Sequence, residues 1–378
     1  MVAQSRQATG EVARGGRSPA RTIRELPPSK SVLVAVLLVS TCISAACGQT
    51  PAGSAPSPTA AVKSADPTPA PTAPATAALP TVAPWSPAPS FGPCLAQDRD
   101  GTARVPHGRN TASMVFDDQR GTLMVAGGVM TQYACDEPPI TWMLSAGAWV
   151  STPGQPRGQM VYDSFRHRVL TLGDQTYAWD GQAWKVVGGA APIGAAAFDA
   201  KRGQVVVYLS TPGGPQTWLF GEATWALAQP THQPSGRDYS VAAWDSRTSN
   251  VVLWGGALDG QASQSRLRET WTWDGIDWQN RSADASPPSS ESNAMADGPT
   301  GVTLYTLASG TSQLWSFDGS RWTRLADPTP RPRFAPSIAY DSVHRLVYMF
   351  GGDLGDGAGG KTNETWTFDG SVWQQVGP

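Results

Sequence analysis

The sequence predicts an all-β protein, a six-bladed β-propeller whose blades are four-stranded antiparallel sheets. Three observations lead to this fold class. A nine-residue aromatic motif recurs six times, an aromatic-Asp motif precedes each copy, and the first 100 residues have an unrelated composition. A repeat of 35 to 53 residues indicates stacked supersecondary units rather than one irregular fold.

The recurring motif has the form Thr-Trp-x-aromatic, Asp-Gly and a closing Trp, as in TWTWDGIDW at 270–278. Aromatic and β-branched residues alternate before the turn, as they do in a strand with two distinct faces. In four copies, at 180–181, 274–275, 318–319 and 369–370, Asp-Gly predicts a two-residue type I′ turn with positive φ at both positions. Because 13 of the 16 Trp lie inside the copies, we expect them to pack between blades. The closing residues are Trp149, Trp184, Trp225, Trp278, Trp322 and Trp373.

An aromatic residue followed by Asp ends a short apolar run upstream of each copy, as at Phe116-Asp117; Ala296-Asp297 is the weakest version. A second apolar run is under way six positions after every Asp, and three of these runs end in Gly-Gly. Each unit therefore contains four strands, which is the content of a propeller blade. The predicted blades span about 105–152, 153–188, 189–228, 229–282, 283–326 and 327–378, within a domain at 93–378.

These Gly-Gly ends, aromatic pairs and closing Trp residues resemble the kelch repeat over roughly residues 105–378. The resemblance implies a scaffold similar to that of galactose oxidase and of bacterial sialic-acid epimerases. For galactose oxidase the resemblance extends to the scaffold only. Its copper site needs two His, two Tyr and a Cys–Tyr cross-link, whereas the cysteines beyond the signal are expected to pair with each other and His167 and His344 fall at the constant-turn end. For the epimerases it implies Arg and acidic residues at the channel. A seventh blade built from residues 85–104 stays open, although that segment lacks both motifs.

Residues 1–47 are predicted to be an export signal, with a basic region followed by the uncharged apolar run 31–46. This run is shorter than the ~20 residues of a membrane span and fits a secretory signal. Its end, Ser44-Ala45-Ala46-Cys47, resembles a bacterial lipobox, apart from Ser44 where Leu is usual. The resemblance implies lipidation of Cys47 and an exported lipoprotein of the cell membrane. An uncleaved anchor and a simple secreted form are the alternatives.

Residues 48–92 are rich in Pro, Ala and Thr and carry few charges, so they predict a disordered, semi-rigid tether. Cys94 and Cys135 are the two cysteines beyond the signal. For an exported domain we expect them to form a disulfide, with two free buried thiols as the alternative.

Loops of variable length fall at one end of the predicted propeller, at 129–140, 257–269 and 353–364, and the short constant turns fall at the other. Binding usually resides in variable loops on a rigid scaffold, so we place the candidate site at the variable-loop end. The candidate ligand-binding residues there are Arg109, Arg237, Arg333, His107 and His232. Three arginines in equivalent positions would hold a carboxylate or sulfate, or else brace backbone carbonyls.

The sequence shows no metal-binding, nucleophile or phosphate-loop motif, so we expect no cofactor and no bound metal. Glu269 and Glu364 share one repeat position, which favours a structural role over catalysis. A formal charge of −2 excludes the basic footprint of a nucleic-acid-binding protein.

The predicted function is a non-catalytic, membrane-tethered module that binds an extracellular protein or a polysaccharide. Contact with the membrane is expected through the lipid anchor only. The alternative is a carbohydrate-active enzyme, epimerase- or lyase-like, in which the three arginines bind an acidic sugar.

Overall fold

The computed structural model describes residues 105–130, 140–154, 156–258, 266–283, 285–288, 290, 292–325, 330–355 and 360–378. All of these belong to one unit, Pro74–Pro378. The predicted signal with Cys47, the linker, Cys94 and Cys135 lie outside the described residues, as does the segment 85–104. Within the described ranges there is no helix long and apolar enough to cross a membrane.

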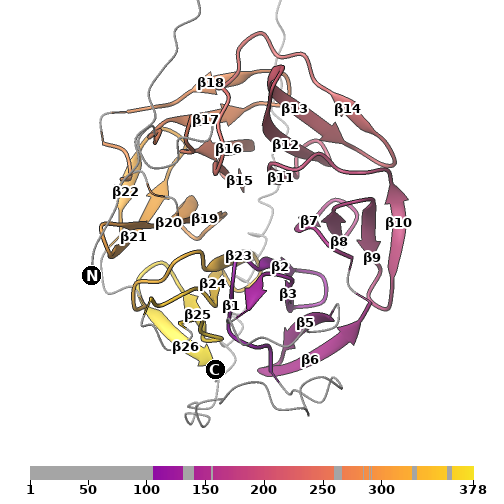
Figure 1. Cartoon of the computed structure of the whole chain (residues 1–378), viewed down its shortest axis with the longest axis vertical. Helices are drawn as coiled ribbons and strands as arrows, with labels where there is room; N and C mark the ends of the chain where they lie inside the picture. The colour runs from indigo at the N-terminus through magenta and orange to yellow at the C-terminus, as the bar shows by residue number, and fades with distance from the viewer. Residues whose placement is uncertain are drawn as a thin grey trace, which may run out of the picture. The chain divides into compact units, whose positions relative to one another are not determined.

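Six four-stranded antiparallel sheets form a ring of blades, which confirms the predicted fold class (Figure 1). Each blade uses one contiguous stretch of chain, so no strand is shared across the closure of the ring. The first blade consists of β2 (Ser113–Asp117), β3 (Thr122–Ala126), β5 (Ile140–Ser145) and β6 (Ala148–Pro153). The second consists of β7 (Gln159–Asp163), β8 (Arg168–Leu172), β9 (Thr176–Trp179) and β10 (Trp184–Gly188). The next two consist of β11 (Ala195–Asp199), β12 (Gln204–Thr211), β13 (Gly214–Phe220), β14 (Trp225–Leu227) and β15 (Val241–Asp245), β16 (Asn250–Trp254), β17 (Thr270–Trp273), β18 (Trp278–Asn280). The last two consist of β19 (Ser292–Ala296), β20 (Val302–Ala308), β21 (Thr311–Phe317), β22 (Trp322–Arg324) and β23 (Ser337–Asp341), β24 (Leu346–Phe350), β25 (Thr365–Phe368), β26 (Trp373–Gly377).

The first strand of every blade lies at the centre of the ring and the fourth at its perimeter (Figure 1). A short extra pair, β1 (Arg109–Asn110) and β4 (Val129–Met130), joins the start of the first blade to its own Gly-Gly segment. The central strands therefore present their residues to an axial channel, and the functional site is built on them.

The constant turn after each first strand is organised by a buried aspartate. In five blades this Asp is fully buried, and its carboxylate accepts backbone N–H bonds from residues two or three positions further on. The second carboxylate oxygen accepts from the side chain three positions on, as from Arg120, Arg202 and His344. This side-chain capping explains why the spacing to the second strand is constant.

Six apolar clusters hold the ring together, and each lies between two adjacent blades. The closing Trp residues belong to these contacts, as the repeat pattern predicts. Trp278 and Trp322, for example, donate their indole N–H at 2.8 Å to Thr217 and Thr270 of the preceding blade. Trp149 of the first blade packs edge-on against Phe350 of the last, with ring centroids 5.8 Å apart, and so closes the ring.

The prediction of two-residue type I′ turns at Asp-Gly is wrong. The strands end one residue before the Asp and resume four residues later, so the loop has four residues, as at 180–183 between β9 and β10. The Gly is at positive φ, 102° for Gly181, whereas Asp180 is not. Instead the Asp180 carboxylate accepts the N–H groups of Gln182 and Ala183 at 2.8 and 2.9 Å. A two-residue loop with positive φ at both positions occurs at Ala146-Gly147, in the one copy that lacks Asp or Glu before its closing Trp.

Candidate functional site

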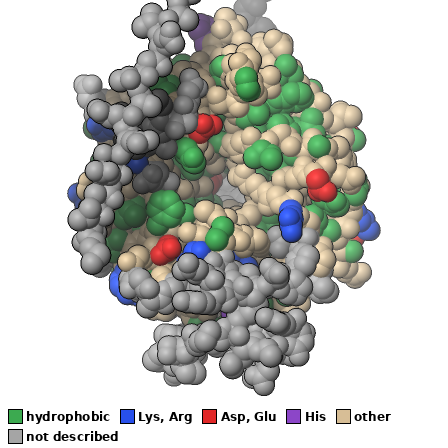
Figure 2. All heavy atoms as spheres, viewed as in Figure 1, with side chains coloured by type: hydrophobic (Ala, Val, Ile, Leu, Met, Phe, Trp, Pro, Cys, Tyr) green, Lys and Arg blue, Asp and Glu red, His purple; other side chains and the backbone are tan. Residues whose placement is uncertain are grey.

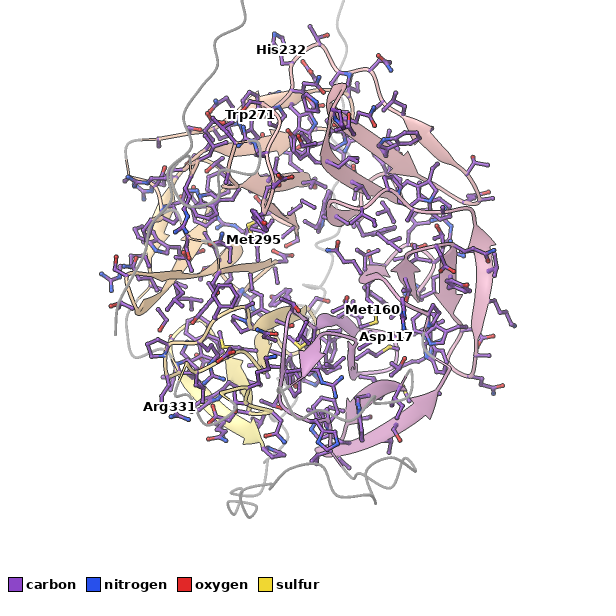
Figure 3. The ribbon with its side chains drawn as sticks, viewed as in Figure 1. Asp117, Met160, His232, Trp271, Met295 and Arg331 are labelled. Carbon is purple, nitrogen blue, oxygen red and sulfur yellow. The ribbon has the colours of Figure 1, made fainter. Side chains whose placement is uncertain are left out.

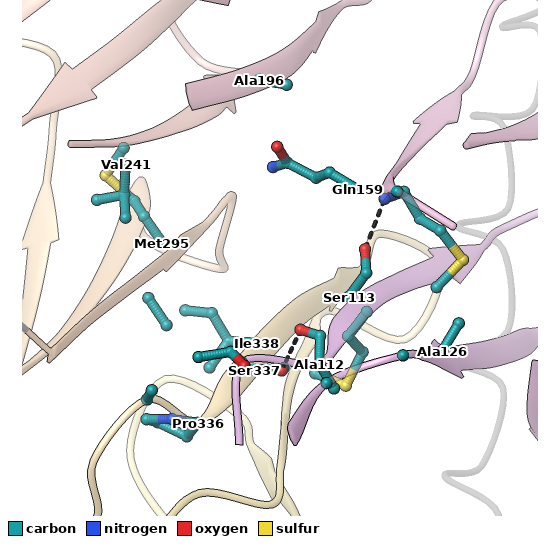
Figure 4. A pocket seen from close by; sticks show the side chains of 18 of the residues that line it. Ala112, Ser113, Ala126, Gln159, Ala196, Val241, Met295, Pro336, Ser337 and Ile338 are labelled. Atoms are coloured by element: carbon teal, nitrogen blue, oxygen red, sulfur yellow. Dashed lines mark hydrogen bonds between the residues drawn. The ribbon is translucent and has the colours of Figure 1, made fainter. Parts of the chain in front are cut away.

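The variable-loop end of the channel opens into a cavity of about 830 Å³, lined by the first residues of the central strands (Figures 2 and 4). Its wall is mostly Ala, Gly and Met, which leaves the centre of the ring open; Met160 and Met295 lie beside this opening in Figure 3. Polar side chains stand among them, including Ser113, Gln159 and Asn293. Ser113 accepts the N–H of Met160 at 2.5 Å, so it also ties two blades together.

The three predicted arginines are buried and do not converge on this cavity. Their side chains are only 1 to 2% exposed, and among them only Arg109 contributes to the described lining. In Arg237 and Arg333, Nε donates to the carbonyl two residues earlier and one Nη donates to the first Gly of the Gly-Gly pair in the same blade. Arg109 makes the same two contacts, with His107 and Gly127. The geometry therefore matches the bracing alternative, within each blade.

Glu269 and Glu364 complete this brace in two blades. Arg237 donates to the Glu269 carboxylate at 2.6 Å, and Arg333 donates to that of Glu364 at 2.8 Å. Burial would raise the pKa of each Glu, but hydrogen bonds from the neighbouring Arg and Trp outweigh it and hold the pKa below its usual value. The backbone carbonyl of each Glu also accepts the N–H of the first Gly. The arrangement fixes the Gly-Gly turn and gives the carboxylates a structural role.

The two predicted histidines do not line the channel cavity. His232 lies at the perimeter of the ring (Figure 3) and pairs with Asp277 at 2.7 Å, in the Asp-Gly turn of the fourth blade. His107 contributes its carbonyl to Arg109 and is also absent from the described lining. The expectation that His232 stands at the channel mouth is therefore wrong, whereas the ligand role of His107 stays a prediction. No cluster of three or more His, Cys, Asp or Glu suited to a metal occurs among the described residues.

A groove of about 810 Å³ runs beside the channel mouth at the second and third blades. It shares Arg157, Gln159 and two glycines with the channel cavity, so the two spaces adjoin. The connection between β8 and β9 spans only 173–175, which leaves this part of the rim low. Ile193, 89% exposed, stands in the groove wall with Tyr177 and Leu172. The repeat pattern did not identify Gln159 or Ile193, because the residue types at these positions differ from blade to blade.

The opposite end of the channel holds a separate space of about 340 Å³, at the constant turns. The two spaces share four lining residues, Met114, Ala242, Met295 and Ile338, which form the waist between them. Aromatic side chains and the carboxylates of Asp118 and Asp297 line the constant-turn end. The sequence predicts no site here, because turns of nearly constant length suit a structural end.

Comparison with known proteins identifies the fold. No protein-family model and no curated protein matches the chain. Among solved structures, that of YjhT matches with a TM-score of 0.50 and 9% identity, covering 72% of this chain and 98% of the other. A chain of a nidogen/laminin complex matches with a TM-score of 0.40 and 10% identity over 57% and 79%. At these identities the first likeness supports the β-propeller architecture alone, and the second carries no argument.

Proposed function

We propose that this protein is a binding module that takes an extended segment of an extracellular protein into the channel mouth and its side groove. The observation that carries the proposal is that the two spaces adjoin at Arg157 and Gln159. A rigid ring with a hollowed end is suited to binding, because its recognition residues are already in place and little ordering is required.

The lining indicates the chemistry of the ligand. Arg157 is exposed where the groove meets the channel, and with Arg109 it supplies the charge of the described channel lining. The groove walls are largely apolar: Ile193 is exposed, Tyr177 is half-buried and Leu172 is buried. We therefore expect a segment that presents an apolar side chain to the groove and an acidic group to Arg157. A polysaccharide ligand would favour aromatic platforms, and Tyr177 is the sole aromatic residue in the described groove wall.

The acidic-sugar enzyme is not favoured. It depended on three arginines converging on an open cavity, whereas Arg237 and Arg333 are sequestered by carbonyls and carboxylates of their own blades. The Glu269 and Glu364 carboxylates are committed to those arginines. Because these carboxylates are paired with arginines, a binding role fits the residues of the site better than an acid–base mechanism does.

We also propose that the blades are of the kelch type and that the protein is exported and tethered through Cys47. The kelch proposal is supported by the brace of Arg, Gly-Gly and Glu, which two blades share in full. The tether is supported by the signal-like segment 1–47 and the Pro-rich segment 48–92. Palmitate labelling that is lost in Cys47→Ala supports the tether; membrane association that persists in that variant opposes it.

Binding is tested with the full chain, against a displayed peptide library and a glycan array. We expect enriched peptides to combine an apolar and an acidic residue, and Ile193→Asp and Arg157→Glu each to abolish their binding. Ile276→Asp is the matched control, because Ile276 is 79% exposed in an Asp-Gly turn at the other end. Peptide binding unaffected by both groove variants would overturn the site. Glycan binding without peptide binding would replace the ligand class, and glycan turnover would refute a non-catalytic role.

A further inference from the structure

We propose that the constant-turn end of the channel is a second binding site, for a small organic cation with an aromatic or apolar body. This site lies at the opposite end from the groove, so the inference does not depend on the proposed function. Three features support it: the shape of the cavity, its aromatic wall and its charge.

The wall is partly aromatic because the residue before the turn Asp lines the space in five blades, where it also packs against the clusters between blades. These residues come from the central strands of the first four blades and of the last. The fifth blade has Ala296 at the same position, which leaves a gap in the aromatic wall. The aromatic residues that line the space are Phe116, Tyr162, Phe198, Trp244 and Tyr340. A volume of about 340 Å³ is at the lower limit for small-molecule sites, so it suits a molecule with one ring rather than a polymer.

The charge of the described wall is negative. Asp118 and Asp297 are its charged side chains, and no Lys, Arg or His is among the described lining residues. The nearby Arg247 and Arg345 direct a guanidinium N–H to the carbonyls of Thr300 and Pro299. An organic anion would meet two carboxylates here without a cationic partner, whereas a cation would gain from both.

Each carboxylate is held in place by a serine of an adjacent blade. Ser342 donates its hydroxyl to Asp118 at 2.6 Å, and Ser246 donates to Asp297. Burial is the main cause of the raised pKa of Tyr340; both carboxylates are near enough to raise it further, and Arg345 lowers it. Burial also raises the pKa of both aspartates, which shows that neither charge is fully compensated. An ammonium group would supply the missing countercharge, and aromatic faces attract such cations.

The two mouths of the channel therefore differ in chemistry. The variable-loop mouth has Arg157 and Arg109 in its described lining, and the constant-turn mouth has Asp118 and Asp297. A ligand that fits one mouth is disfavoured at the other, since its charge would be repelled there.

The test uses the full chain at pH 7.5 with three probes of similar size: benzylamine, benzyl alcohol and benzoate. Calorimetric titration, or saturation-transfer NMR for weak binding, gives the affinities. We expect benzylamine to bind at least about tenfold more tightly than benzyl alcohol, and benzoate not to displace benzylamine, because the charge of benzoate suits the Arg157 mouth at the other end. Equal affinities of the amine and the alcohol, or no amine binding at 10 mM (about 2.7 kcal/mol), would overturn the proposal.

Two variants locate the site. Asp118→Asn and Asp297→Asn are each expected to weaken benzylamine binding about tenfold and to leave benzyl alcohol unchanged. Glu222→Gln is the matched control, because Glu222 is 85% exposed in a turn at the same end and does not line the cavity. A tenfold loss in this control would show that only the general charge of that end matters, which would refute a specific site. The comparison of probes on the unsubstituted protein holds even where a variant fails to fold.

Discussion

Replacement of Asp297 by Asn is expected to stabilise the protein at neutral pH. Asp297 stands in the fifth blade, where burial raises its pKa to about 6, against 3.8 for an ordinary Asp. Hydrogen bonds from Ser246 and from the N–H of Gly298 lower the pKa but do not offset burial, and the nearby Asp245 raises it further. The ionised carboxylate is therefore less favourable in the folded protein than in the unfolded chain.

The magnitude follows from linkage between proton binding and folding. A shift from 3.8 to about 6 corresponds to about 3 kcal/mol, at 1.36 kcal/mol for each pKa unit. Between those two pH values the folded state binds more protons than the unfolded state, so the free energy of unfolding falls as pH rises. The loss is absent below about pH 4 and complete above about pH 6 to 7. A carboxamide at this position does not titrate, so the Asp297→Asn variant would not incur this loss.

Urea denaturation of the two full-length proteins, at steps from pH 4 to 7.5, gives the difference in their free energies of unfolding. We expect this difference to grow from near zero at pH 4 to about 3 kcal/mol in favour of the variant at pH 7.5. Glu222→Gln should show no such growth, because its carboxylate is largely exposed. A difference independent of pH, or a variant less stable at pH 7.5 than at pH 4 relative to the parent, would refute the reasoning.

Two further substitutions test the packing of the ring. Thr217→Val removes the acceptor of the Trp278 indole and leaves a buried N–H unpaired, so the free energy of unfolding should fall by about 1–3 kcal/mol. Thr323→Val is the control, because Thr323 is exposed and its loss should change the free energy of unfolding little. Equal effects of the two would contradict an inter-blade role for that bond. Gly352→Ala places a Cβ 3.0 Å from the buried Arg333 side chain, at a φ of +100°. In Gly310→Ala the new Cβ meets no atom within 4 Å, at a φ of +75°. Gly352→Ala should therefore lower the denaturation midpoint clearly more than Gly310→Ala does. A larger shift for Gly310→Ala would show that the Gly-Gly turn tolerates a side chain.

The repeat architecture could be predicted because the same contacts recur in most blades. A buried Asp that caps a turn and a Trp that packs on the preceding blade each constrain one position, and most blades repeat the constraint. The Asp-Gly turns could not be predicted by the same reasoning. Dipeptide preference concerns backbone φ, whereas the Asp acts through its side-chain carboxylate and so selects a longer loop.

The candidate site was only partly accessible from sequence. The position of Arg237 in the repeat was visible, but its burial depends on Glu269, 32 residues away, and on the carbonyl of Gly255. The sequence offered both a ligand role and a bracing role, and the three-dimensional contacts favour bracing. His232 illustrates a second limit, because the link between the third and fourth blades passes the perimeter, where Asp277 holds the imidazole.

The fifth blade connects these observations. Its Ala296-Asp297 is the weakest copy of the aromatic-Asp motif, and it is also where the carboxylate bonds Ser246 of the preceding blade instead of the N–H groups two and three positions on. The change leaves a partly compensated charge beside a gap in the aromatic wall, at an expected cost in stability of about 3 kcal/mol. In the other five blades the corresponding Asp is fully buried and accepts backbone N–H bonds from its own turn. A departure that destabilises the ring while shaping an acidic cavity is what a site kept for binding would produce. If Asp297→Asn both stabilises the protein and weakens the binding of benzylamine, the two effects have one cause, the partly compensated carboxylate.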